Sequence, residues 1–337
     1  MTAGIDLATL WAFIIAFAVF VYVVMDGFDL GLGILFALFP NKSDRDVIMN
    51  SVAPVWDGNE TWLVLGGGGL MAAFPLAYAV LMPALYTPLI AMLIGLTFRG
   101  VAFEFRWRTR NREVNRWDIA FAGGSLLATL AQGIALGAIL QGIHVEGRHY
   151  AGGWWDWLTP FSILTGLALV VGYSLLGATW LVLKTEGELR DRAYHLSWYL
   201  LFAMLGAIGT VSIATPFLDI QYAQRWFSWP NMILTAPVPI AVAGVTVLLL
   251  RGLAAKRDSQ PFFLVLALFA LSYAGLGISM YPYIVPQSIT IWQAAAPENS
   301  QIFMLFGVAV LVPLILGYTA WAYWVFRGKV RTESGYH

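Results

Sequence analysis

The sequence contains no cysteine and few charged residues. The absence of cysteine excludes disulfides, iron–sulfur clusters, thiolate metal sites and cysteine-linked haem. Only 11% of the 337 residues are charged, whereas soluble domains have about 25%. Basic and acidic residues number 19 each, so the net charge is zero and nothing points to nucleic acid as a partner. Because 59% of the residues are hydrophobic, a lipid bilayer is the expected solvent for most of the chain.

Histidine is missing from the long apolar segments. The four histidines lie between these segments or at the end of the chain, at His144, His149, His195 and His337. Haem iron is usually held by His, Met, Cys or Tyr, and a lone methionine inside an apolar segment more often serves packing. We therefore expect that this chain ligates neither a haem iron nor another metal by itself.

Nine segments are apolar and long enough to cross a membrane, which takes roughly 20 residues. They are residues 7–39, 54–80, 84–105, 117–141, 159–183, 197–218, 233–250, 262–283 and 303–326. The chain is predicted to be an all-α, polytopic membrane protein with about nine transmembrane helices in a single transmembrane domain, 1–337. An odd number of spans allows two four-helix bundles, in halves 1–141 and 159–283, plus one extra helix at 303–326.

The basic residues are distributed unevenly between the two sides that these spans define. Of the 19 lysines and arginines, 17 fall on the side of the C-terminus and 2 on the other side. Basic residues concentrate in cytoplasmic loops. The N-terminus is therefore predicted to be periplasmic and the C-terminus cytoplasmic, in a bacterial inner membrane.

A stretch from Phe105 to Arg110 alternates aromatic and basic residues. Such a pattern suits nucleic acid or anionic lipid. Between two membrane spans, however, it is typical of a cytoplasmic anchor with Trp and Arg side chains at the lipid headgroups, and we favour that interpretation.

Two pairs of carboxylates lie inside or at the start of predicted spans. Asp26 and Asp29 are three residues apart in the first span, and Asp57 and Glu60 are three apart at the start of the second. Residues at this spacing share one face of a helix. Ionisable residues within a membrane are costly and are functional candidates by default.

The third span ends with Arg99 and Glu104, which would point about 140° apart on a helix. The predicted orientation brings the ends of the first three spans into one cytoplasmic layer, where Arg99 is a charge partner for the carboxylates. Carboxylates this close in a medium of low dielectric constant cannot all ionise. The group is therefore predicted to carry protons along a pathway.

A structural interpretation stays open beside this one. Asp57 could cap the second helix, and Asn59 and Glu60 could satisfy amides of its first turn. Asp29 could be locked to Arg99 in a buried pair.

A run of four glycines, Gly66, Gly67, Gly68 and Gly69, interrupts the second span. Each weakens a helix by about 1 kcal/mol relative to alanine. Four together indicate close helix packing or an irregular backbone against a partner or ligand. The prolines that follow predict kinks in the second and third helices.

Several motifs in order resemble subunit II of cytochrome bd-type quinol oxidases, including the branch of cyanide-insensitive oxidases. They are Asp26-Gly27-Phe28-Asp29-Leu30-Gly31, Trp56-Asp57-Gly58-Asn59-Glu60, Arg99-Gly100-Val101-Ala102-Phe103-Glu104-Phe105-Arg106, Met280-Tyr281-Pro282-Tyr283-Ile284-Val285-Pro286 and Tyr318-Thr319-Ala320-Trp321. The resemblance runs from about Met1 to Arg327. We take Trp56, Gly58 and Asn59 as structural members of the second motif.

The resemblance implies a role in aerobic respiration. In this family subunit I carries two b-type haems, haem d or a variant, and the quinol site, while subunit II ligates no haem. The two subunits form a pseudo-symmetric heterodimer, joined in some members by a small single-helix accessory subunit. Residues matching Asp57 and Glu104 belong to a path of cytoplasmic proton uptake, and some members hold a quinone in subunit II.

Two other functions compete with a proton-conducting oxidase subunit. Buried carboxylates and kinked helices also suit an ion-coupled secondary transporter. The chain could equally serve assembly alone, with no role in conduction.

Overall fold

The computed structural model describes residues 6–109 and 114–330. Nearly all of them are helical, as expected for a chain whose backbone must satisfy its own hydrogen bonds in lipid. The elements are α1 (Leu7–Phe36), α2 (Lys42–Asn50), α3 (Trp56–Ala73), α4 (Pro75–Ala84), α5 (Tyr86–Arg108), α6 (Val114–Leu140), β1 (Val145–Glu146), β2 (His149–Tyr150), α7 (Pro160–Lys184), α8 (Gly187–Ala214), the 3₁₀ turn η1 (Thr215–Phe217), α9 (Ile220–Phe227), α10 (Asn231–Thr235), α11 (Pro237–Ala254), α12 (Gln260–Met280), β3 (Tyr283–Val285), β4 (Ile289–Thr290), α13 (Ile291–Ala294) and α14 (Glu298–Val325).

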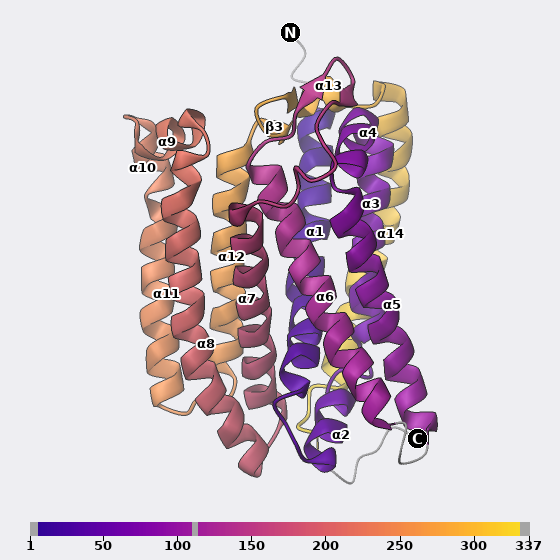
Figure 1. Ribbon diagram of the computed structural model, residues 1–337, viewed down its shortest axis with the longest axis vertical. Helices are drawn as coiled ribbons and strands as arrows, with labels where there is room; N and C mark the ends of the chain where they lie inside the picture. The colour runs from indigo at the N-terminus through magenta and orange to yellow at the C-terminus, as the bar shows by residue number, and fades with distance from the viewer. Residues whose placement is uncertain (1–5, 110–113, 331–337) are drawn as a thin grey trace.

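The long helices run side by side along one axis of the molecule (Figure 1). Short helix α2 lies at one end, which we call the α2 end. Short helices α4, α9, α10 and α13 lie at the other, which we call the α13 end. Helix α1 packs against α3, α6 and α7, and α11 pairs with α12. Two antiparallel hairpins, β1–β2 and β3–β4, belong to the connections between helices.

The predicted all-helical membrane fold is confirmed. Among the described residues, eight helices are long and apolar enough to cross a membrane. Helix α3 also runs lengthwise beside α1 (Figure 1). Its 18 residues span about 27 Å at 1.5 Å per residue, but they include the polar first turn and the four glycines. The predicted number of about nine therefore agrees with eight strongly apolar helices together with α3.

The second predicted span, 54–80, is not one continuous helix. Helix α3 stops at Ala73, Phe74 has non-helical torsion angles, and α4 begins at Pro75. A proline lacks the amide hydrogen for the helical bond and its ring clashes with the preceding turn. The chain therefore breaks, and does not merely kink, at the α13 end of this span.

Several helices extend beyond their apolar segments. Helix α8 begins at Gly187, and not near residue 197 as predicted. Its first turns are polar and carry Glu188, so hydropathy did not include them in the span. Helix α14 similarly begins at Glu298 and not near 303. Hydropathy locates the part of a helix inside the hydrocarbon, whereas hydrogen bonding sets its ends.

Glycines allow the central helices to approach closely. A Cβ atom on Gly31 of α1 would lie 1.8 Å from the backbone oxygen of Tyr173 on α7. A Cβ atom on Gly95 of α5 would lie 2.7 Å from the backbone of Ala128 on α6. These contacts bring α1 and α5, which carry the charged residues of interest, into the packed centre of the bundle.

Candidate functional site

Arg99 of α5 lies at the centre of a buried ionic cluster, which we call the Arg99 cluster (Asp26, Asp29, Glu60 and Arg99). Its Nη1 atom is 2.9 Å from Oδ1 of Asp26 and 2.6 Å from Oε1 of Glu60. Its Nη2 atom is 3.5 Å from Oδ2 of Asp29. Because Asp26 and Asp29 are three apart on α1, both face the same guanidinium. The spacing in the sequence thus predicted correctly which residues come together, and the buried pair between Asp29 and Arg99 is present.

The cluster contains three carboxyl groups and one guanidinium. Asp26 and Asp29 are fully buried, whereas the side chain of Glu60 is 28% exposed. Removing an ion from water costs several kcal/mol unless it is paired, and one guanidinium balances only one full negative charge. Glu60 is the member of the cluster that solvent reaches in this chain.

Polar and aromatic neighbours surround the Arg99 cluster. The Asn59 amide donates from Nδ2 to Oδ2 of Asp29 over 2.8 Å and accepts at Oδ1 from the Tyr323 hydroxyl over 3.0 Å. The Arg99 guanidinium also lies 5.9 Å from the centre of the Trp56 ring, a distance at which a cation is attracted to the ring face. Tyr323 lies far along the sequence, and no sequence signal singled it out.

A second hydrogen-bonded group lies beside the cluster, on the same face of α1. The Tyr22 hydroxyl, one turn before Asp26 on α1, accepts a hydrogen bond of 2.7 Å from Nε2 of Gln132. The Tyr173 hydroxyl donates to Oε1 of the same amide over 3.1 Å. Sequence reasoning missed these three residues, because isolated polar side chains in apolar helices carry no motif.

Asp57 and Glu104 occupy a different environment from the cluster. Both are exposed, and within residues 6–109 and 114–330 neither forms an ion pair. Asp57 lies one turn before Glu60 on α3, whose N-cap is Val55 without a side-chain hydrogen bond, so Asp57 is not a capping residue. Glu104 faces away from Arg99, as their spacing predicts. The expectation that all five carboxylates gather in one group therefore holds for Asp26, Asp29 and Glu60 and not for Asp57 and Glu104.

The four glycines of α3 divide into two faces. Cβ atoms on Gly66 and Gly69 would lie 3.1 Å from Val19 and 3.3 Å from Ile15 of α1, respectively. Cβ atoms on Gly67 and Gly68 would meet nothing within 4 Å. Close packing therefore explains two of the four glycines. The other two, like Gly58 in the first turn, lie open on the surface of the chain.

A second ionic group lies at the α2 end. Arg106 bonds to Asp118 over 2.5 Å and to Asp46 over 2.7 Å, and Arg45 pairs with Asp118 over 2.9 Å. Arg106 is buried, so it is a structural link between α2, α5 and α6 and not a surface contact for nucleic acid. Arg110, the end of the basic stretch, lies outside the described residues.

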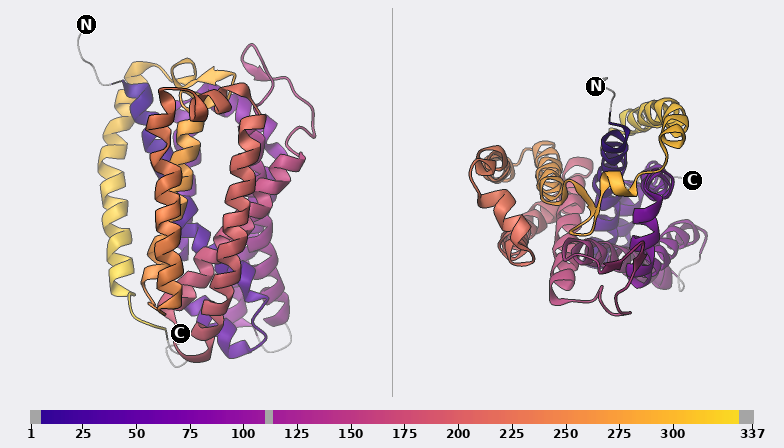
Figure 2. Two further views of the ribbon diagram at one scale, coloured as in Figure 1. Left: turned by 90° about the vertical axis from the view of Figure 1, so that its left-hand side faces the viewer. Right: turned by 90° about the horizontal axis from the view of Figure 1, so that it is seen from above.

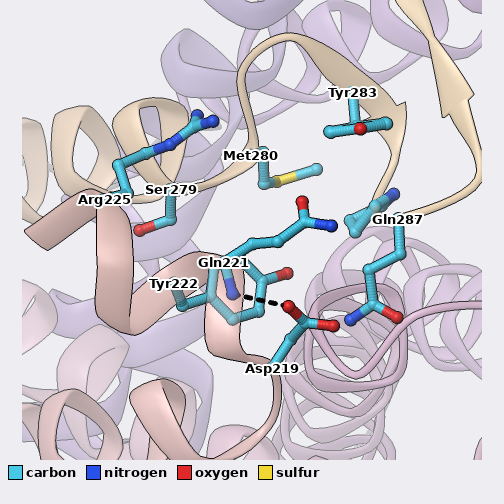
Figure 3. A pocket seen from close by; sticks show the side chains of 9 residues that line it. Asp219, Gln221, Tyr222, Arg225, Ser279, Met280, Tyr283 and Gln287 are labelled. Carbon is cyan, nitrogen blue, oxygen red and sulfur yellow. Dashed lines mark hydrogen bonds between the residues drawn. The ribbon is translucent and has the colours of Figure 1, made fainter.

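Two cavities open near the α13 end. The first has a volume of about 10 Å³ and lies between α9 and the β3–β4 connection, where Asp219 accepts a 2.6 Å hydrogen bond from the backbone of Gln221 (Figure 3). It has room for about one water molecule. The second has a volume of about 250 Å³ and is lined by aromatic residues that include Tyr86 and Trp154.

The described histidines do not fit a haem site within this chain. His144, His149 and His195 are exposed, and His144 faces Glu146 at 3.5 Å in a connecting loop. His337 lies outside the described residues. In the part of the chain that the structure describes, no three His, Asp or Glu side chains are grouped to hold a metal ion.

The comparisons with known proteins identify the family. The family described as cytochrome bd terminal oxidase subunit II matches residues 7–326. The chain belongs to this family. It is therefore a multi-pass membrane subunit of a bacterial respiratory oxidase complex.

Individual relatives agree over nearly the full length. Cytochrome bd-I ubiquinol oxidase subunit 2 of Escherichia coli (strain K12) is 32% identical, over 96% of this chain and 95% of that protein. Cytochrome bd ubiquinol oxidase subunit 2 of Bacillus subtilis (strain 168) is 27% identical, over 96% and 97%. The structure of bd oxidase from Geobacillus thermodenitrificans has the same fold, with a TM-score of 0.74 over 95% of this chain and 99% of that one, at 19% identity.

Proposed function

We propose that this subunit supports the haem-bearing subunit I of a ubiquinol oxidase and contributes to the uptake of cytoplasmic protons for the reduction of oxygen to water. The observation that carries the proposal is the combination of accessible and buried carboxyl groups at successive turns. Asp57 is exposed, Glu60 is partly exposed, and Asp26 and Asp29 are buried behind Arg99. Proton transfer needs carboxyl groups that reach one another or a bridging water.

Glu104 is the second exposed acid in this proposal. It lies on α5 five residues after Arg99, on the surface of the isolated chain. Residues matching Asp57 and Glu104 are associated with proton uptake in the family that the motifs resemble. We propose that both acids face the path to the oxygen-reducing haem of subunit I. In this proposal the carboxyl groups of the Arg99 cluster belong to the same proton pathway, with Arg99 as their charge partner.

The proposed orientation follows from the charge asymmetry of the sequence. The N-terminus is periplasmic and the C-terminus cytoplasmic, so the α2 end of the structure faces the cytoplasm. We also propose one transmembrane domain of two four-helix halves, with α14 as the extra helix. In support, α14 packs less extensively than the other long helices, since Gln301 is its one buried residue in the described chain.

The cofactors of the complex belong, in this proposal, to subunit I: two b-type haems and haem d or a variant. The exposure of the described histidines supports this assignment. A small accessory subunit and a bound quinone are further proposals from the resemblance. The aromatic cavity of about 250 Å³ approaches the size of small ligand pockets, about 300 Å³.

The test replaces each exposed acid by its amide in the complete complex. Asp57→Asn and Glu104→Gln keep the volume of the side chain but cannot cycle a proton. We expect normal haem content with oxygen reduction per haem at least about tenfold slower, since positioned proton transfer contributes about 10²- to 10⁴-fold. Glu104→Asp, which keeps the carboxyl group, is expected to retain much of the activity.

Matched controls separate conduction from assembly. Glu146→Gln changes an exposed acid in the β1–β2 hairpin and should leave turnover unchanged. If Asp57→Asn and Glu104→Gln both turn over at the full rate per haem, the two residues are not part of a proton path. A parallel fall of haem content and activity, with normal turnover per haem, would support the assembly alternative. The transporter alternative instead predicts solute flux by a pigment-free chain.

A further inference from the structure

Helix α14 stands at the edge of the molecule, and its position depends on few contacts (Figure 2). One of its residues, Gln301, is buried among the residues described. Near the α13 end, the Trp11 indole donates a hydrogen bond of 3.2 Å to the backbone oxygen of Gln301. At the other end the chain leaves the helix as a short segment, residues 326–330, which we call the C-terminal strap.

The C-terminal strap is tied to the end of α7. Lys184 donates from Nζ to the backbone oxygens of Phe326 and Gly328, the second over 3.0 Å. The backbone nitrogen of Val330 donates in return to the backbone oxygen of Lys184 over 2.8 Å. These bonds join two segments that are more than 140 residues apart in sequence. They tie the chain just after the last turn of α14 to the end of α7.

An ion pair completes the attachment. Nζ of Lys329 lies 2.5 Å from Oδ2 of Asp258 in the α11–α12 connection. Burial by itself would raise the pKa of Asp258, but hydrogen bonds from Lys329 and Tyr194 outweigh it and lower this pKa below the ordinary value of 3.8. Asp258 therefore stays ionised at neutral pH, and the strap stays attached.

Tyr323, in the last turn of α14, points into the bundle. Its ring centre lies 6.5 Å from that of Phe28 and 6.2 Å from that of Trp180, in edge-to-face contacts. Its hydroxyl donates to Oδ1 of Asn59 over 3.0 Å. Through this bond α14 contacts Asn59, which in turn donates to Asp29 of the Arg99 cluster.

The hydrogen bond from Tyr323 favours one orientation of the Asn59 amide, as does a longer bond from its Nδ2 atom to the backbone of Met25. Asn59 is 1% exposed, and its Nδ2 donates to Asp29 over 2.8 Å and to the backbone oxygen of Met25 over 3.4 Å. An amide nitrogen can only donate and an amide oxygen can only accept. While Oδ1 receives the Tyr323 hydroxyl, Asp29 therefore meets a donor, and a donor favours the ionised form of a carboxyl group.

We propose that Tyr323 is a positioning residue for the Arg99 cluster: its hydroxyl holds the Asn59 amide in the orientation that donates to Asp29 and thereby sets how readily Asp29 takes up a proton. Arg99 reaches Asp29 only at 3.5 Å, and Oδ1 of Asp29 has no hydrogen-bond partner among the described residues. The Asn59 amide is therefore the closest described donor to this carboxyl group.

Other charged and titratable groups contribute to the same balance. Those facing Asp29 are Arg99 on α5, Asp26 on α1, Glu60 on α3 and Tyr323 on α14, while Tyr22 and Tyr173 face Asp26 from α1 and α7. Apart from Tyr323 itself, all of these groups are kept when only the Tyr323 hydroxyl is removed. The functional consequence of the inference rests on the proposed role of the cluster in proton uptake, whereas the positioning of Asn59 does not.

The experiment removes the hydroxyl and keeps the ring. In the purified complex, Tyr323→Phe retains the contacts with Phe28 and Trp180 but frees the Asn59 amide to turn its oxygen toward a protonated Asp29. We expect the pH at which Asp29 is half protonated to rise by about 0.5 to 1 pH unit, the equivalent of one neutral hydrogen bond. The readout is an infrared titration of the carboxyl C=O band, assigned with Asp29→Asn, together with the pH profile of turnover per haem.

Two further variants make the result decisive. Tyr318→Phe removes an exposed hydroxyl from the same helix and should shift neither readout. Lys184→Met frees the strap without touching Tyr323, and we expect a smaller shift in the same direction. If Tyr323→Phe does not assemble, the Lys184→Met titration decides the question.

Each outcome distinguishes the two proposals. A shift of both readouts supports the positioning role together with proton uptake. An infrared shift with an unchanged pH profile of turnover supports the positioning role and speaks against proton uptake through the cluster. An unchanged midpoint of the Asp29 infrared titration in Tyr323→Phe overturns the inference and leaves Tyr323 as a packing residue. The same result in Lys184→Met overturns it if Tyr323→Phe does not assemble.

Discussion

Arg99 is the side chain on which the buried charges depend. It is 1% exposed and is the partner of both aspartates of α1 as well as of Glu60. A guanidinium suits this task because its planar fork presents several donors at once and it stays charged. Lysine would supply the charge as a compact point, without the planar fork that spreads the donors of Arg99 over two nitrogen atoms.

Arg99→Leu should therefore prevent normal assembly. It leaves the carboxyl groups buried without a counter-charge, and breaking a buried pair costs about 3–5 kcal/mol. We expect strongly reduced yield and thermal stability of the complex, measured by haem content and by thermal unfolding. The yield and thermal stability of Arg99→Lys should fall between those of Arg99→Leu and those of the unchanged complex. The control Arg148→Gln changes an exposed residue of the β1–β2 hairpin connection. It should change the stability of the complex by no more than about 0.5 kcal/mol. Normal yield of Arg99→Leu would show that the acids are stable without their partner.

Helix pairs in this subunit pack through glycine at particular crossings and not wherever glycine occurs. At Gly31 and Gly177 the backbones of α1 and α7 nearly touch, since a Cβ atom on Gly177 would lie 2.7 Å from the backbone carbon of Gly31. Gly67 and Gly68 of α3 have no such neighbour. The close crossing of α1 and α7 lies two residues from Asp29, so it helps to set the depth of the Arg99 cluster.

Gly31→Ala is expected to destabilise the complex. The added methyl group would lie 1.8 Å from the backbone oxygen of Tyr173, and relieving the clash requires the two helices to separate. Overpacking of a core typically costs about 1–3 kcal/mol. Gly206→Ala on α8, where nothing lies within 4 Å, is the matched control and should not lower the melting temperature, since alanine favours a helix over glycine. Equal melting temperatures for both variants would mean that α1 and α7 do not pack as closely as described.

The whole chain alternates direction from one long helix to the next. Helix α1 begins at the α13 end, and α14 ends near α2, at the opposite end of the molecule (Figure 1). An odd number of crossings places the two termini on opposite sides of a membrane. The 17 to 2 division of basic residues is the basis of our proposal that the more basic side faces the cytoplasm.

Reporter fusions test this topology. A cytoplasmic fluorescent reporter after Phe326 should be active, and alkaline phosphatase, which needs export, should be inactive there. The same two reporters inserted at Arg148 should behave in the opposite way. Export of the reporter at Phe326 would contradict both the number of spans and the orientation. Identical activity at both positions would place the C-terminal ends of α6 and α14 on the same side of the membrane, against the proposed topology.

Local sequence was sufficient for the spans, the orientation hypothesis and the motifs that carry the family resemblance. Hydropathy depends on neighbouring residues, so the long helices were predictable, apart from the break at Phe74 and the polar extensions of α8 and α14. The spacing of Asp26 and Asp29 likewise predicted that they share one helix face, and the spacing of Arg99 and Glu104 predicted that they do not. Local helical geometry alone determines such relations.

Contacts between distant helices were decided only by the tertiary packing. Tyr323 and Asn59 are 264 residues apart, and their hydrogen bond depends on where α14 is held against the bundle. The same holds for the pairing of Arg106 with Asp46 and Asp118. The rotation of each helix about its own axis is set by the sum of its contacts with its neighbours. No single stretch of sequence encodes that sum.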